Sequence, residues 1–332
     1  MRRLLRLLVW ILVPGLIWAV SSGCQEKEEH FHIGVLQWTE RIRPFERTYK
    51  GVLDGLYSKG FKQGLNLKIS YKNAEQDKSV ALKIGREFVK EDVDVIVALG
   101  TGSSLAALKA TEDKRIPIVF SIAGAPKATG LIQDFNDSGR NITGVSMRVP
   151  VRTQFELFKE ILPGLKKIGI LYCTETPQAI STGKEAALAA REFGWERLVV
   201  FFPAQELPRL SEKVKFLARK ADAIYVPTDP VLDSPENLNT IIRVADNQRI
   251  PVFAVTRKDV EDGALMAVHC DFYEIGKQAA NPIIQVLKGV DPRMIPSQLP
   301  TMKKLSLNLT KARHLGIQIR RNSILKADNI FD

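Results

Sequence analysis

The chain contains an internal repeat, in which a run of alternating strand and helix patterns is followed by a second run in the same order. The segment IGVL at 33–36 returns as IGIL at 168–171, and RIPIVF at 115–120 returns as RIPVFA at 249–254. In both runs the two segments are separated by nearly the same length of chain. Alternating strands and helices are typical of α/β folds with parallel sheets. The repeat therefore predicts two similar α/β lobes in one chain of 332 residues.

Apolar strand patterns alternate with amphipathic helix patterns throughout both runs. In the first run we expect strands at 32–38, 66–72, 94–100 and 117–123, and helices at 45–59, 79–91 and 103–113. In the second run we expect strands at 167–173, 197–203, 222–228, 251–256 and 264–270, and helices at 178–193, 207–220 and 235–247. An aspartate, Asp94 or Asp222, leads the corresponding strand of each run.

A helix pattern at 272–289 and a strand pattern at 305–309 follow the second run and have no counterpart after the first. We therefore expect the chain to cross back between two Rossmann-like lobes with parallel sheets, joined by a hinge of several crossovers. The expected lobes are 32–147 plus about 272–300, and 148–271 plus about 301–332. Ligands of open α/β sheets bind beyond the carboxyl ends of the strands. The expected site is therefore the cleft between the lobes.

The first 23 residues have the layout of a secretory signal peptide. Three arginines precede an apolar stretch at 7–20, and the tripeptide Ser22-Gly23-Cys24 follows it. This tripeptide resembles the bacterial lipoprotein processing box, although Ser21 stands where leucine is usual. We expect lipidation at Cys24, a polar tether at 24–31, and a protein anchored to a membrane face in the periplasm or on the cell surface. The alternative is plain secretion with an unrelated cysteine.

The basic residues that give the net charge of +11 are spread along the chain. In an exported protein this distribution is typical of a solvated basic surface, and it argues against nucleic acid as a partner. Besides Cys24 the chain contains Cys173 and Cys270. Two cysteines so far apart in sequence do not establish a disulfide, although an oxidising compartment would permit one.

Several segments, in order, are similar to those of an uncharacterised group of ABC transporter substrate-binding lipoproteins with the type 1 periplasmic-binding-protein fold. They are VDVIVALGT at 93–101, IPIVFSIAGAPKATGLI at 116–132, LPGLKKIGILY at 162–172, ADAIYVPTDP at 221–230 and FYEIGKQAA at 272–280. The resemblance implies a receptor that closes on a small molecule and delivers it to ABC permease and ATPase subunits. Some relatives are associated with aromatic amino acids. We expect a monomer that needs no cofactor.

The chain departs from that family's pattern at two positions. The family usually carries an aspartate before the proline at 126, where this chain has Ala125, and an aspartate is common after GVS, where this chain has Met147. If those carboxylates meet a ligand ammonium group in the family, their loss argues against an ordinary amino acid as ligand. A neutral, acidic or more apolar ligand is then expected.

The glycine-rich turn GTGSS at 100–104 lies between a predicted strand and a predicted helix. Such a turn exposes backbone N–H groups at a helix N-terminus, where negative charge is favoured. The turn lacks the Gly-Lys-Ser/Thr ending of a phosphate loop. We expect Thr101, Gly102 and Ser103 to bind a polar or anionic ligand group. The alternative is that Thr101 or Ser103 only caps the helix.

Other candidate ligand-binding residues follow the ends of the expected strands. They are Gln37, Trp38, Ser121 and Ser146 in the first lobe, and Thr228, Asp229, Thr256 and Asp271 in the second lobe or at the crossover. Asp229 is the expected partner for a ligand donor if it faces the cleft, and otherwise a turn residue before proline. Trp38 would form an aromatic wall of the site or pack at the edge of the lobe.

Enzymatic chemistry finds little support in the sequence. None of the four histidines lies in a metal-ligand spacing, and no Gly-x-Ser-x-Gly elbow is present. His269 and Cys270 are neighbours on a strand, so their side chains point to opposite faces. We therefore expect a binding protein without catalytic or metal-binding residues. The alternatives are a ligand-sensing input protein for a signalling partner and an extracytoplasmic enzyme.

Overall fold

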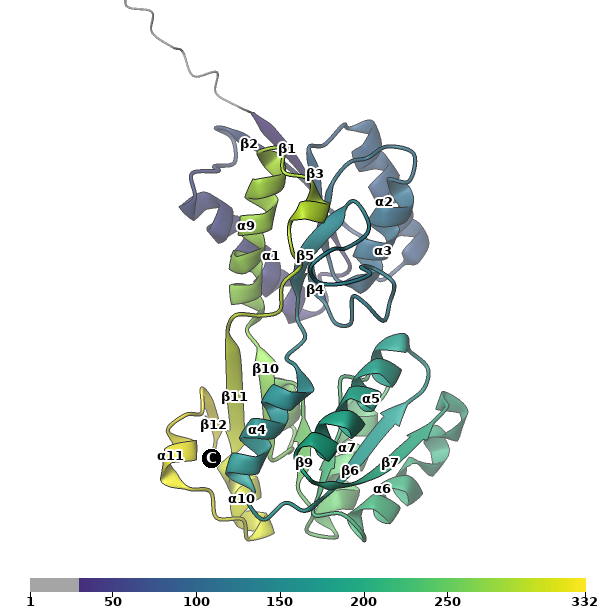
Figure 1. Ribbon diagram of the computed structural model, residues 1–332, viewed down its shortest axis with the longest axis vertical. Coiled ribbons are helices and arrows are strands. Elements are labelled where there is room, and N and C mark those ends of the chain that lie inside the picture. The colour runs from purple at the N-terminus through teal and green to yellow at the C-terminus, as the bar shows by residue number, and fades with distance from the viewer. Residues whose placement is uncertain (1–29) are drawn as a thin grey trace, which may run out of the picture.

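The computed structural model describes residues 30–332 and contains two α/β lobes, one above the other in Figure 1. Each lobe is built on its own sheet, which confirms the predicted α/β class with two Rossmann-like lobes. The predicted signal peptide, Cys24 and all but the last two residues of the predicted tether lie outside the described residues.

The first lobe contains a parallel five-stranded sheet between two pairs of helices. Its strands are β1 (Phe31–Gln37), β2 (Leu67–Asn73), β3 (Val95–Leu99), β4 (Ile118–Ala123) and β5 (Ile142–Ser146), in the order β2-β1-β3-β4-β5. Its helices are α1 (Arg43–Ser58), α2 (Lys78–Lys90), α3 (Thr101–Ala110) and α9 (Phe272–Leu287). Alternate residues of a strand face opposite layers, so Val97 packs on the side of α1 and α9 while Ile96 packs on the side of α2 and α3.

The second lobe contains a seven-stranded sheet. Its strands are β6 (Lys167–Cys173), β7 (Glu196–Phe202), β8 (Ala223–Tyr225), β9 (Val252–Ala254), β10 (Met266–Cys270), β11 (Lys303–Asn308) and β12 (Asn329–Phe331), in the order β12-β11-β10-β9-β8-β6-β7. Its helices are α4 (Val151–Ile161), α5 (Pro177–Glu192), α6 (Leu210–Ala218), α7 (Pro235–Asp246), α8 (Arg257–Glu261), α10 (Leu309–Leu315) and α11 (Arg321–Ile324). β11 runs antiparallel to β10, because it enters the sheet at the edge where β10 leaves it.

The two runs of the sequence repeat occupy equivalent places in the two sheets. β1 lies between β2 and β3, and β6 lies between β7 and β8. Asp94 Oδ2 accepts the backbone N–H of His32 at 2.6 Å, and Asp222 Oδ2 accepts that of Lys167 at 2.8 Å. The two repeated aspartates therefore tie together the starts of neighbouring strands in the same way in both lobes.

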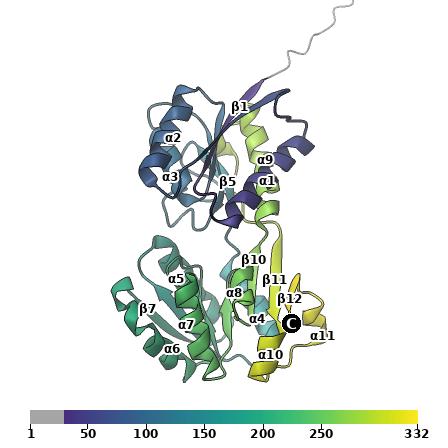
Figure 2. The same ribbon diagram turned by 180° about the vertical axis from the view of Figure 1, so that it is seen from behind.

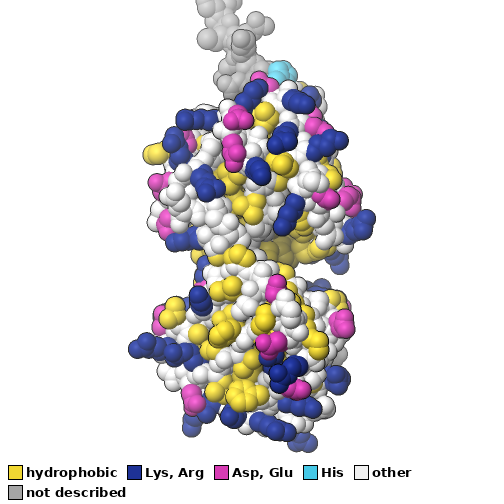
Figure 3. All heavy atoms as spheres, turned by 90° about the vertical axis from the view of Figure 1, so that its right-hand side faces the viewer, with side chains coloured by type: hydrophobic (Ala, Val, Ile, Leu, Met, Phe, Trp, Pro, Cys, Tyr) yellow, Lys and Arg dark blue, Asp and Glu magenta, His cyan; other side chains and the backbone are white. Residues whose placement is uncertain are grey.

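Three crossovers connect the lobes: one after β5, one after β10 and one before β11 (Figures 1 and 2). β5 runs parallel to the other strands of its sheet, and β10 runs parallel to β9, β8 and β6. Because both strands end at a crossover, the carboxyl ends of both sheets face the space between the lobes. Figure 3 shows that the molecular surface narrows to a waist and is hollowed there. We call this space the interlobe hollow.

Helix α9 follows β10 in sequence but packs in the first lobe, beside α1 (Figure 1). The two helices approach closely because glycines face each other. A Cβ atom at Gly51 would clash with the carbonyl oxygen of Tyr273, and a Cβ atom at Gly276 would clash with that of Thr48. This close packing fixes the second crossover between β10 and α9.

The sequence analysis did not predict β5 or α4. β5 has only five residues and contains Gly144, at which a Cβ atom would clash with the carbonyl oxygen of Phe120. A short buried strand with an internal glycine has a weak sequence pattern. α4 begins directly after the first crossover, at Pro150 and Val151, without a side-chain cap that would mark its start.

Candidate functional site

The predicted glycine-rich turn lies at the edge of the interlobe hollow, where β3 ends and α3 begins. Gly100 is the N-cap residue of α3, with a φ of +96° that favours glycine. No side chain within residues 30–332 caps this helix end, so the cap by Thr101 or Ser103 that the sequence also permitted is not observed. The N-terminal turn of α3 therefore offers N–H groups without a side-chain acceptor, in a position where an anion is stabilised.

Two aromatic rings cover the glycines of this turn. A Cβ atom at Gly100 would lie 2.8 Å from the ring of Phe45, and a Cβ atom at Gly102 would lie 2.5 Å from the ring of Trp38. Both aromatic side chains are only partly buried. The spacing of the glycines is thus explained by two rings that pack on the turn. These rings also give the edge of the hollow an apolar, aromatic surface next to the N-terminus of α3.

Three buried polar atoms at the carboxyl edge of the first sheet have no hydrogen-bond partner within residues 30–332. They are Gln37 Oε1, Ser103 Oγ and Ser121 Oγ. Gln37 is 1% exposed, and both serines are 0% exposed. Buried polar atoms in native proteins almost always have partners, and an unpaired one costs about 1–3 kcal/mol. All three belong to the predicted site, where they remain candidates for contact with a ligand.

Gln37 and Ser121 lie in one row across the sheet. Gln37 pairs with Leu99, and Leu99 pairs with Ser121, so the two polar residues are separated by one strand. At the usual strand spacing they are about 10 Å apart. The Nε2 of Gln37 donates to the carbonyl oxygen of Thr39 at 3.1 Å, which orients the amide and leaves Oε1 as a free acceptor.

The hydroxyl of Ser146, at the end of β5, forms hydrogen bonds within the first crossover both as donor and as acceptor. Its hydroxyl donates to the carbonyl oxygen of Ala123 at 2.7 Å and accepts the N–H of Arg148 at 3.1 Å. The Arg148 guanidinium forms an ion pair with Glu185 of α5. This geometry favours a structural role for Ser146 over the predicted contact with ligand.

Asp229, expected to meet a ligand donor if it faces the cleft, is 0% exposed and binds backbone N–H groups. It accepts the N–H of Cys173 at 2.5 Å, that of Val231 at 2.9 Å and that of Leu232 at 3.3 Å. These contacts hold the turn after β8 against the end of β6. The geometry therefore favours the other reading of the sequence, a turn residue before proline.

Thr256 and Asp271 are both N-cap residues. Thr256 Oγ1 accepts the N–H of Asp259 at 3.1 Å, and the Asp259 carboxylate accepts the N–H of Thr256 at 2.8 Å, which forms a capping box at α8. Asp271 accepts the N–H groups of Tyr273 and Glu274 at the start of α9. Both residues lie at strand ends as expected, and both stabilise helix ends there.

Thr228 and Thr101 are half-buried at the ends of β8 and β3. The backbone carbonyl of Thr228 accepts the hydroxyl of Thr182 at 3.0 Å, and the same hydroxyl contacts the carbonyl of Gln178 at 3.0 Å. Thr182 therefore joins the first turn of α5 to the segment that carries Thr228. Sequence reasoning missed Gln178 and Phe45, because neither follows a strand directly.

Asp233 is a further acidic residue that the sequence did not single out. Its Oδ2 accepts the N–H of Asp229 at 3.2 Å in the turn between β8 and α7. Burial, followed by the nearby carboxylates of Asp259 and Asp229, raises the pKa of Asp233 well above its usual range. This side of the hollow therefore holds carboxyl groups whose charged forms are disfavoured.

Within residues 30–332 no group of three or more His, Cys, Asp and Glu side chains is arranged to hold a metal ion. The His269 ring contacts the carbonyl oxygen of Cys270 and the hydroxyl of Ser306. Burial raises the pKa of the Cys270 thiol to about 12, which disfavours the reactive thiolate. None of the helices in this part of the chain is both long and apolar enough to cross a membrane.

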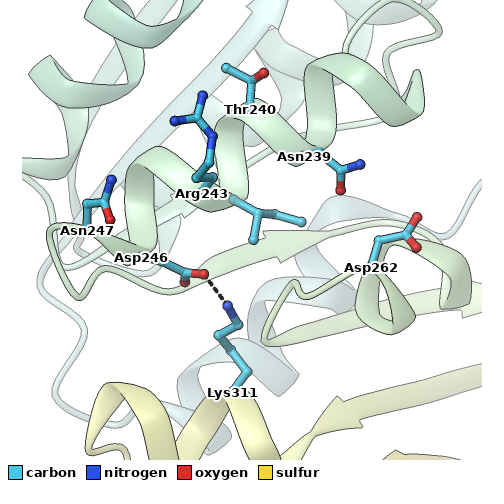
Figure 4. A pocket seen from close by; sticks show the side chains of 8 residues that line it. Asn239, Thr240, Arg243, Asp246, Asn247, Asp262 and Lys311 are labelled. Carbon is cyan, nitrogen blue, oxygen red and sulfur yellow. Dashed lines mark hydrogen bonds and ion pairs between the residues drawn. The ribbon is translucent and has the colours of Figure 1, made fainter.

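A surface pocket of about 480 Å³ lies away from the crossovers, between α7 and α10 of the second lobe (Figure 4). Two of the residues that line it, Lys311 and Asp246, form an ion pair. Asp246 ends α7 and α10 follows β11, so the pocket is at the opposite end of the lobe from the interlobe hollow. The predicted site residues do not line it.

Comparisons with known proteins agree with this fold. The family model described as ABC transporter substrate binding protein matches residues 32–330. A tyrosine-binding protein of Clostridioides difficile is 29% identical over 305 residues, which is 92% of this chain and 85% of the relative.

Two solved structures share the fold over 91% of this chain. One is an ABC domain from Streptococcus pneumonia in complex with L-Trp, which is 28% identical, with a TM-score of 0.74 and all of that chain covered. The other is the ligand-free, open structure of a substrate-binding protein with adhesive properties from Clostridium difficile, which is 26% identical, with a TM-score of 0.79 and 98% of that chain covered.

Proposed function

Because this chain belongs to the ABC transporter substrate-binding protein family, we propose that it captures a small solute in the interlobe hollow and delivers it to the permease and ATPase of an ABC importer. Binding would draw the lobes together, since a ligand held by both stabilises the closed arrangement. The protein acts as a monomer, needs no cofactor and leaves its ligand chemically unchanged.

The observation that carries this proposal is a set of buried atoms, Gln37 Oε1, Ser103 Oγ and Ser121 Oγ, beside the N-terminus of α3. Among the residues that the structure describes, these atoms have no hydrogen-bond partner and no side chain caps the helix end. Two hydroxyl donors and the N–H groups of α3 suit a carboxylate. The rings of Trp38 and Phe45 pack on the same turn and suit an apolar or aromatic group. The proposed ligand is therefore an aromatic solute that carries a carboxylate. The relatives named for tyrosine and solved with L-Trp support this class.

The ligand's amino group, if it has one, meets a neutral acceptor in the first lobe. Ala125 and Met147 replace the aspartates that the family resemblance leads one to expect. Gln37 Oε1 is a neutral acceptor that has no partner within residues 30–332. An amide oxygen attracts an ammonium group less strongly than a carboxylate does. The carboxylate and the ring are therefore expected to contribute more to affinity than the amino group.

The experiment is calorimetric titration of L-tyrosine and two analogues into the purified protein. Tyramine lacks the carboxylate, and 3-(4-hydroxyphenyl)propionate lacks the amino group. We expect tyrosine and the propionate to bind and tyramine not to bind. Ser103→Ala should weaken binding of tyrosine by about tenfold, the effect of losing one hydrogen bond to a charged group. Binding of tyramine as tight as that of tyrosine would contradict the proposed carboxylate site.

We propose lipid anchoring at Cys24 on the extracytoplasmic side of the membrane, supported by the signal-like sequence before it. Replacing Cys24 with Ser should move the protein from the membrane fraction to the soluble fraction of the same compartment. An unchanged distribution would contradict lipidation at this residue.

A further inference from the structure

A direct contact joins the two lobes beside the first crossover. Gly124 follows β4 in the first lobe, and Gln178 is the second residue of α5 in the second lobe. A Cβ atom at Gly124 would lie 2.6 Å from Nε2, 2.7 Å from Cδ and 2.8 Å from Oε1 of Gln178. The whole carboxamide therefore lies against Gly124, and the absence of a side chain there makes the contact possible.

The Gln178 carboxamide is available for hydrogen bonds with a ligand. Its backbone carbonyl accepts the hydroxyl of Thr182, but none of the hydrogen bonds found in residues 30–332 involves its side chain. The side chain is partly exposed. Two N–H donors and one acceptor are thus available to a ligand. Through Thr182 the same turn is fixed to Thr228.

The segment that presents Gly124 is held in a strained, well-anchored conformation. Ile122 has a φ of +52°, which is rare for a β-branched residue, and the pairing of β4 with β5 shifts register there. The carbonyl oxygen of Ala123 accepts both the Ser146 hydroxyl and the N–H of Met147. Strained backbone of this kind persists where surrounding contacts hold it, and it clusters at binding sites. Gly124 lies three residues after Ser121, whose hydroxyl has no partner within residues 30–332.

From these contacts we infer that Gln178 is a ligand-binding residue of the second lobe and the contact through which that lobe closes on Gly124. Its carboxamide recognises a polar group of the solute held at Ser121 and α3, and its contact with Gly124 sets the spacing of the lobes at this point beside the first crossover. The inference rests on the proposed function, because it assigns the second wall of the same site.

The test is a rescue experiment with three variants and two control variants. Gly124→Leu places a side chain where the carboxamide lies, and Gln178→Ala removes the carboxamide. The double variant Gly124→Leu/Gln178→Ala restores the space. Gly164→Leu is the control for added bulk, because a Cβ atom at Gly164 meets nothing within 4 Å. Gln248→Ala is the control for loss of an exposed glutamine. L-tyrosine and L-tryptophan serve as probes in calorimetry.

We expect Gly124→Leu to weaken binding by about tenfold or more, and the double variant to bind about as well as Gln178→Ala alone, since contacting residues are not additive. Gln178→Ala itself should weaken binding by about threefold to tenfold, the loss of one or two hydrogen bonds. Both controls should bind like the unaltered protein. Additive effects of the two substitutions, or normal affinity in Gly124→Leu, would overturn the inference.

A second measurement separates this inference from the proposed function. Small-angle X-ray scattering without ligand should give a larger radius of gyration for Gly124→Leu than for the unaltered protein, and a normal value for the double variant. If neither amino acid binds but this pattern appears, the ligand class is wrong and the lobe contact stands. If the amino acids bind and all variants scatter alike, the lobe contact is wrong.

Discussion

At the scale of single residues, the two sides of the interlobe hollow are built differently. In the second lobe, the carboxylates of Asp229, Asp259 and Asp271 bind backbone N–H groups and stabilise turns and helix ends. In the first lobe, the polar atoms of Ser103 and Ser121 are unpaired among the residues that the structure describes. The first lobe is therefore expected to contribute most of the hydrogen bonds to a ligand.

A substitution at Asp229 tests whether the carboxylates of the second lobe have a structural role. Asp229→Ala leaves three N–H groups without their acceptor, so it should lower the free energy of unfolding by about 2–4 kcal/mol. Urea denaturation followed by circular dichroism measures this, with Asp113→Ala, an exposed aspartate, as the control. Normal stability combined with lost ligand binding would show instead that Asp229 contacts the ligand.

Asp233 predicts a pH dependence of stability. Because burial and neighbouring carboxylates raise its pKa in the folded protein, the folded state holds this proton more tightly than the unfolded state does. The resulting stabilisation is present below the unfolded pKa and is lost as the pH rises through the folded pKa. Asn at this position still accepts the N–H of Asp229 and carries no charge.

Asp233→Asn should therefore be more stable than the unaltered protein at neutral pH, by roughly 1 kcal/mol. The difference should shrink toward about pH 4, where the aspartate is protonated. Denaturation midpoints across this range measure it. A difference in midpoint between the two proteins that stays constant over the whole pH range would mean that the surroundings do not shift the pKa of Asp233.

At the scale of elements, α3 and its turn combine two properties of the proposed site. The helix N-terminus favours negative charge, and the glycines before and within its first turn admit the rings of Phe45 and Trp38. From the sequence, the turn and its position after a strand could be predicted. The ring contacts could not, because Phe45 belongs to α1, far away in the chain.

The same distinction explains which site residues the sequence could indicate. Strand ends are visible as apolar patterns, so Gln37 and Ser121 could be chosen as site residues. Whether a strand-end residue has a free side chain depends on tertiary contacts, as with Asp229, whose partner at Cys173 lies on another strand. Gln178 lies inside a helix pattern, and only the approach of Gly124 from the other lobe marks it.

One side chain of α9 forms several hydrogen bonds with the third crossover. The Nε2 of Gln278 donates to Gln298 Oε1 at 2.8 Å and to the Leu299 carbonyl at 3.0 Å, and its Oε1 accepts the N–H of Thr301 at 3.1 Å. Gln278→Ala should therefore speed hydrogen exchange at Thr301 and lower stability by about 1 kcal/mol. Gln285→Ala, at an exposed position of the same helix, is the control. Equal exchange in both variants would show that the crossover is held by other contacts.

At the scale of the whole molecule, the repeat predicted two α/β lobes because each run carries enough strands and helices for its own sheet. The repeat could not predict that β11 runs antiparallel to β10, because the direction of β11 depends on where the chain re-enters the second sheet. The direction of β5 and β10 into the crossovers places the carboxyl ends of both sheets on the interlobe hollow. Ligand binding there couples to the relative position of the lobes.

Small-angle X-ray scattering with saturating L-tyrosine tests this coupling most directly, once calorimetry has established that the site is filled. A solute held by both lobes should reduce the radius of gyration at constant molecular mass, and Ser103→Ala should require a higher concentration for the same change. A filled site with an unchanged radius of gyration would contradict binding between the lobes.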